Sequence, residues 1–116
     1  MTQVHGFLGP IVFVMNVLRV IWTGYRMFTG RALPAERPLT GLYLGLFDLQ
    51  AFLGLILLAT VGTRAVSLLH PVLMLLAAVV AHMGVARGRK PDTPAAVPFA
   101  LAVISTILVA AAYPSP

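Results

Sequence analysis

The sequence predicts an all-helical fold: a single-domain, four-helix integral membrane bundle that crosses the bilayer up, down, up and down. The first observation is composition, because 59% of the 116 residues are hydrophobic and only 9% are charged, whereas soluble domains carry about 25% charged residues. The second is a set of four apolar stretches, each near the roughly 20 residues that span a hydrocarbon core. The third is the one-sided placement of Arg and Lys between these stretches.

The four apolar stretches are separated by short segments rich in Gly, Pro and charged residues, which end helices. Helices are required because backbone groups in lipid must be satisfied within the segment itself. Pro71 and Pro98 lie near two expected helix starts, where a missing N–H is tolerated. The expected helices cover residues 7–28, 39–61, 68–86 and 95–113.

The basic residues predict the orientation of the bundle. The second connecting segment contains only Arg64. The first and third segments, together with the helix end before the first, contain six basic residues: Arg26, Arg31, Arg37, Arg87, Arg89 and Lys90. Because loops rich in Arg and Lys stay in the cytoplasm, we expect both termini on the non-cytoplasmic side. The net charge of +5 then reflects this rule and contact with the anionic lipid bilayer. No nucleic-acid partner is expected, since no basic face carries aromatic stacking residues.

Four polar residues fall at membrane depth, where unpaired polar groups are costly. At 1.5 Å of rise per residue, Arg19 and Asp48 reach similar depths on antiparallel neighbours, so we predict an ion pair between them. Asn16 shares a helix face with Arg19 by its spacing, and Gln50 has a similar depth. This layer is interpreted as a structural clamp, and a proton or ion relay is the alternative.

The histidines are the candidate ligands. His5, just before the first expected helix, and His70, in the first turn of the third, belong to the non-cytoplasmic side. Helix bundles hold haem with side chains from facing helices, so these two are candidate axial ligands of haem b, with Met15 and Met74 lining the site or replacing a ligand. Alternatively, both histidines simply lie at the membrane interface. His82, about 18 Å further along its helix, has no evident partner at its depth, and we expect it to pack or to form a hydrogen bond.

Three segments carry a resemblance: Gly45–Leu55 with its Asp-x-Gln, Leu69–Ala77 with its His-Pro-x-x-Met, and Ala81–Gly84. They resemble small bacterial four-helix membrane proteins labelled cytochrome-b-like, although residues 6–10 lack the Arg-containing start of those proteins. The resemblance implies a bacterial inner-membrane location and a haem-binding electron-transfer role. The residues at matching positions are His5, Gln50, His70, Met74 and His82.

Three functions remain open from the sequence. The first is a small subunit of a respiratory or photosynthetic electron-transfer complex, with other membrane subunits as partners. The second is a non-catalytic accessory subunit without a cofactor. The third is a proton-coupled transporter, similar in size to small multidrug exporters, in which Asp48 would have to replace their first-helix Glu. We expect no independent enzymatic activity, because Ser67 and Ser105 have no adjacent base. The absence of cysteine excludes disulfides, thiolate metal sites and covalent haem attachment.

Overall fold

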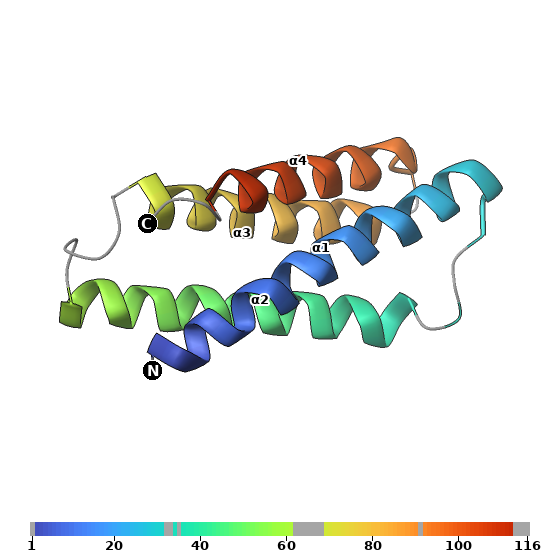
Figure 1. Cartoon of the computed structure of the whole chain (residues 1–116). Helices are drawn as coiled ribbons and strands as arrows, with labels where there is room; N and C mark the ends of the chain where they lie inside the picture. Colours follow the sequence, from blue (N-terminus) through green and yellow to red (C-terminus); the bar gives the residue numbers. More distant parts are fainter. Residues whose placement is uncertain (1, 32–33, 35, 62–68, 91, 113–116) are drawn as a thin grey trace.

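The computed structural model describes residues 2–31, 34, 36–61, 69–90 and 92–112. Over these residues the all-helical prediction is confirmed (Figure 1). The predicted helix ends at Leu68 and Tyr113, and the loop residue Arg64, lie outside the described residues. The four helices are α1 (Thr2–Thr29), α2 (Glu36–Val61), α3 (Leu69–Gly88) and α4 (Ala96–Ala112).

The start of α1 differs most from the prediction, because the helix begins at Thr2 and not at residue 7. The prediction placed the boundary at the first apolar residue, but helical hydrogen bonds also form in polar sequence. His5 therefore lies inside α1, and the expectation that it precedes the helix is wrong. Pro10 also lies inside α1, and its missing N–H removes the hydrogen bond that Gly6 would otherwise accept.

The connection after α1 shows how the chain leaves one helix and enters the next. Gly30 has a φ of 73°, the left-handed conformation that favours glycine after a helix end. Its N–H donates to the Arg26 carbonyl at 2.8 Å. α2 then begins at Glu36 and not at residue 39, because a carboxylate is favourable near a helix N-terminus and Pro38 is tolerated in a first turn.

Each helix packs against its two neighbours in the cyclic order α1, α2, α3, α4, so α1 and α3 lie diagonally across the bundle. The first turns of α1 and α3 lie at one end, and the α1–α2 and α3–α4 connections lie at the other (Figure 1). We call the first the histidine end, since it contains His5 and His70. The second is the arginine end, with Arg26, Arg37 and Arg89.

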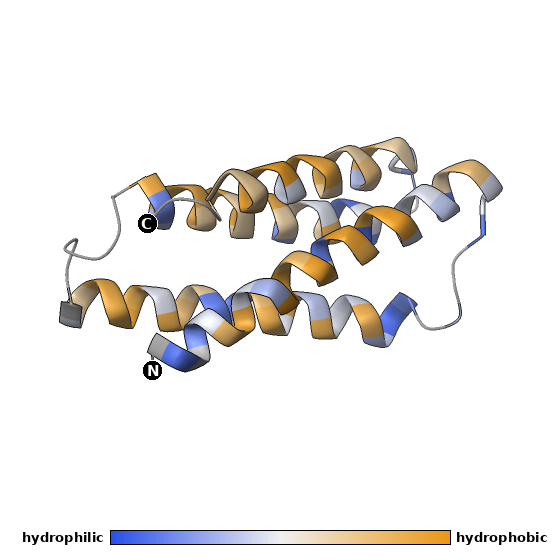
Figure 2. Cartoon of the chain, viewed as in Figure 1, coloured by the Kyte–Doolittle hydropathy of each residue, from blue (hydrophilic) through white to orange (hydrophobic). Residues whose placement is uncertain are grey.

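Three helical segments are long and apolar enough to cross a membrane: His5–Thr29, Glu36–Thr60 and Leu69–Gly88. α4 is apolar but shorter, with 17 residues. Hydrophobic residues cover most of all four helices, whereas the start of α2 is hydrophilic (Figure 2). Large apolar side chains such as Phe28 and Phe52 are exposed. Soluble monomers rarely expose apolar surface on this scale, so the structure indicates a membrane protein.

The core contains aromatic side chains where α1 meets α2, and small side chains on α3. Tyr43 packs edge-to-face against both Trp22 and Phe47, with ring centroids 6.3 and 5.8 Å apart. Ala77 and Ala81 are buried on α3, and small side chains let helix backbones approach closely. Several polar side chains are buried among these apolar contacts, and they define the candidate site.

Candidate functional site

Arg19 and Asp48 bind different partners in the structure. The Arg19 guanidinium donates to the hydroxyl of Thr40 at 3.4 Å. The carboxylate of Asp48 accepts a hydrogen bond from His82 Nε2 at 2.8 Å. The predicted ion pair between Arg19 and Asp48 is therefore wrong, whereas the expectation that His82 packs or forms a hydrogen bond is confirmed.

The face of α2 that contacts α1 explains this difference. Its buried residues are Tyr43, Phe47 and Gln50, which follow the three- and four-residue spacing of one helix face. Asp48 lies about 100° around the helix from Phe47, and its side chain points toward α3. The ion pair was predicted from depth, and depth along a helix does not specify the direction of a side chain.

Asn16 connects three helices in the middle of the bundle. Its side chain is fully buried, and its Oδ1 accepts hydrogen bonds from Ser105 at 3.0 Å and from Tyr43 at 3.5 Å. Its Nδ2 donates to the Val12 carbonyl at 2.8 Å. The sequence did not single out Ser105 as a partner. The sequence nevertheless contained a signal for this contact, because a hydroxyl group within an apolar helix needs a hydrogen-bond acceptor in lipid.

The predicted histidine ligands face each other at the histidine end. His5 comes from α1 and His70 from α3, the two helices that are diagonal in the bundle. Their ring centroids are 6.4 Å apart, and the ring planes make an angle of 80°. Two imidazoles separated by most of the chain therefore meet in the space between four helices.

The ring of His70 is held in one orientation by the end of α4. Its Nδ1 lies 2.8 Å from the carbonyl oxygen of Ala112. A carbonyl only accepts hydrogen bonds, so Nδ1 carries the hydrogen, and in the neutral ring the lone pair is on Nε2. Histidines that bind metals usually have this arrangement, in which a backbone carbonyl fixes the ring and frees the other nitrogen.

The ring of His5 lies against the backbone of α2. A Cβ added at Gly54 would lie 3.1 Å from His5 Cε1, so the absence of a side chain at this position makes room for the ring. The amide nitrogen of Gln50 donates to the His5 carbonyl at 2.9 Å. Within the described part of the chain, the buried Nδ1 of His5 has no hydrogen-bond partner. Such groups are rare and need an explanation, and a missing ligand is one.

The chemistry of the pair limits what it can hold. Among the described residues, no three or more His, Cys, Asp or Glu side chains form a possible metal site, so a protein-only zinc site with three or four ligands is not formed there. Haem needs only axial ligands from the protein. A linear nitrogen–metal–nitrogen unit places the ring centroids about 6 Å apart, given bonds of about 2 Å, which is near the observed 6.4 Å.

The two methionines are part of the apolar surroundings of the bundle interior. Met15 is buried, and Met74 packs against the same hydrophobic core one turn after His70. Met74 is therefore close to His70 along α3, whereas Met15 lies ten residues from His5, about 15 Å along α1.

Comparisons with protein families, curated proteins and solved structures find no match for this chain. The resemblance to cytochrome-b-like membrane proteins rests on the residues quoted above. Function is therefore argued from the geometry of the site.

Proposed function

We propose that the chain is a small membrane subunit of an electron-transfer complex and binds one b-type haem between His5 and His70. The observation that carries this proposal is the facing of the two imidazoles across the diagonal of the bundle, with centroids 6.4 Å apart. When bound, the haem supplies the one-electron redox chemistry. The chain holds its iron and sets the polarity around it.

Each histidine has its own supporting contacts. The Ala112 carbonyl orients His70 through Nδ1, so Nε2 is the nitrogen that would bind iron. Gln50 fixes the backbone at His5, and Gly54 leaves room for the His5 ring. Contacts of this kind orient a ligand and tune the group it holds.

A flat macrocycle between rings 6.4 Å apart requires the surrounding side chains to separate. The segment best suited to move is the part of α1 before Pro10, because the proline removes one of the hydrogen bonds that join it to the rest of the helix. The larger part of α1 can then keep its packing in the core.

We infer that the bundle lies in the inner membrane of a bacterium, with the arginine end in the cytoplasm and both termini outside, because the basic residues gather at the arginine end. α4, with 17 residues, is at the lower limit of about 17–25 residues for a spanning helix, which supports four crossings. The histidine end then lies near the outer surface. Other membrane subunits would exchange electrons with the haem there.

Absorbance of the purified protein tests the proposal. We expect a b-type reduced-minus-oxidised spectrum that His70→Ala abolishes. The matched control is His82→Gln on the same helix, which should keep the spectrum because His82 binds Asp48 and not the site. A folded protein that stays colourless after addition of haem would exclude the proposal and leave an accessory subunit without a cofactor.

Proton-coupled transport is a second candidate, favoured by the hydrogen bond between Asp48 and His82. Asp48 is near the middle of α2, and Arg19 does not neutralise it. Proton uptake into vesicles on addition of ethidium would test this candidate. Asp48→Asn should abolish the uptake and Asp92→Asn, in the exposed α3–α4 connection, should preserve it.

A further inference from the structure

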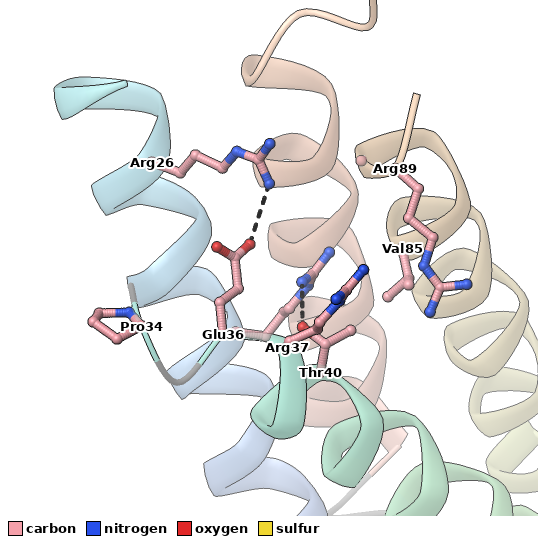
Figure 3. Close-up of a pocket in the computed structure, with 9 residues that line it drawn as sticks. Arg26, Pro34, Glu36, Arg37, Thr40, Val85 and Arg89 are labelled. Atoms are coloured by element: carbon pink, nitrogen blue, oxygen red, sulfur yellow. Dashed lines mark hydrogen bonds and ion pairs between the residues drawn. The ribbon is translucent and has the colours of Figure 1, made fainter. Parts of the chain in front are cut away.

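The arginine end contains a cavity of about 630 Å³ between α1, α2 and α3 (Figure 3). Its charged lining consists of four arginines, Arg19, Arg26, Arg37 and Arg89, and one carboxylate, Glu36. The arginines come from α1, from α2 and from the residue that follows α3, so their convergence is a property of the fold and not of one basic segment.

Arg19 is the buried charge in this cavity, with 5% of the residue exposed. Its guanidinium carbon lies 5.7 and 5.8 Å from the ring centroids of Trp22 and Tyr43. Its hydrogen bond to Thr40 is long, at 3.4 Å, and no carboxylate of the described residues forms an ion pair with it. A buried charge with so little compensation is strongly unfavourable, so an anion from outside the chain would stabilise it.

Glu36 supplies only part of a counter-charge for Arg19. It attracts Arg19 electrostatically, but its Oε1 pairs with Arg26 at 3.4 Å, and no carboxylate of the described residues lies within ion-pair distance of Arg19, Arg37 or Arg89. Figure 3 shows Arg89 across the cavity from the Arg26–Glu36 pair, with Arg37 between them. Positive charge without a carboxylate partner therefore lines the cavity from the Arg26–Glu36 pair across to Arg89.

We propose that this cavity binds a phosphate group, carried by an anionic phospholipid headgroup or by a soluble phosphate. Guanidinium groups match the tetrahedral oxygens of phosphate through paired hydrogen bonds. The volume lies within the usual range for ligand pockets, about 300–1,000 Å³. Basic pockets between helices at the cytoplasmic surface bind anionic headgroups in other membrane proteins. This site is at the opposite end from the histidines and does not depend on haem binding.

Trp22 provides a reporter, because it is the only tryptophan in the chain and its ring contacts Arg19. Its fluorescence would be titrated in phosphatidylcholine vesicles with increasing phosphatidylglycerol. A second titration would use inorganic phosphate at constant ionic strength, with chloride as the replaced anion. We expect a saturable change in at least one titration. Saturation with phosphatidylglycerol alone identifies a headgroup, and saturation with inorganic phosphate identifies a soluble ligand.

Variants separate a specific site from general attraction between charges. Arg89→Gln and Arg37→Gln should each weaken binding by roughly fivefold, and both residues are exposed, so folding should persist. Arg19→Gln should weaken it more, and Glu36→Gln should strengthen it. The matched control is Arg87→Gln, an exposed residue at the same end of α3 that does not line the cavity. The proposal is overturned if neither ligand gives saturation, or if the Arg87 variant loses as much affinity as the Arg89 variant.

Discussion

The two ends of the bundle organise their polar groups in different ways. At the histidine end, the Ala112 carbonyl fixes the ring of His70, and the ring of His5, 6.4 Å away, lies against the backbone at Gly54. At the arginine end, guanidinium groups outnumber the carboxylate that could neutralise them. The first arrangement suits a group held by directed coordination bonds, and the second suits an exchangeable anion held by charge. One small bundle therefore offers two independent kinds of site.

The largest expected effect is the loss of haem in His70→Ala with no loss of phosphate binding. The substitution removes one of the two proposed axial ligands, whereas the cavity is built from other residues at the opposite end. Haem spectra and Trp22 titrations on the same preparation would measure both. If the two signals disappear together in a folded protein, the ends are coupled and the comparison fails.

Asn16 joins α1, α2 and α4 in the middle of the bundle, so Asn16→Leu should lower the stability of the whole fold. It leaves the hydroxyls of Tyr43 and Ser105 without their shared acceptor, and we expect the free energy of unfolding to fall by about 2–4 kcal/mol. Denaturant titration in detergent would measure this change. Thr60→Val is the control, because that exposed hydroxyl bonds only within its own helix; an equal loss there would contradict the role of Asn16.

A smaller and local effect is expected for Gly54→Ala. The new methyl group would lie 3.1 Å from His5 Cε1 and must displace the ring by a few tenths of an ångström. Haem content should fall, or the redox potential should shift, while phosphate binding stays unchanged. Gly45→Ala is the matched control on the same helix, since a Cβ there meets no atom within 4 Å. If neither substitution changes the haem content or the redox potential, the haem does not lie beside His5 and Gly54.

The smallest effect is expected for the hydrogen bond between Asp48 and His82. Both side chains are about half exposed at membrane depth, where hydrogen bonds between helices contribute roughly 0.6–2 kcal/mol. A double-mutant cycle with Asp48→Asn and His82→Gln would measure the coupling in the free energy of unfolding. A coupling energy well above this range would make the pair a structural element comparable to Asn16.

Hydropathy was enough to predict the four helices, because burial in lipid depends on composition and length. It also placed His5 and His70 at the same end, since chain direction alternates between helices. It did not give the partner of Arg19, because depth leaves the direction of a side chain open. The hydrogen bond from Ser105 to Asn16 connects residues 89 positions apart, and no local pattern specifies such a contact.

Pro10 affects the rates of association and release at the histidine pair. Because it interrupts the ladder of backbone hydrogen bonds, the two turns that carry His5 can open as a local unit, with less free energy than global unfolding requires. Association and release at the histidine pair would then follow the frequency of this opening, while the lifetime of the bundle is set by its interior. Replacement of Pro10 would change the rate at which the site exchanges its ligand, without changing the lifetime of the folded protein.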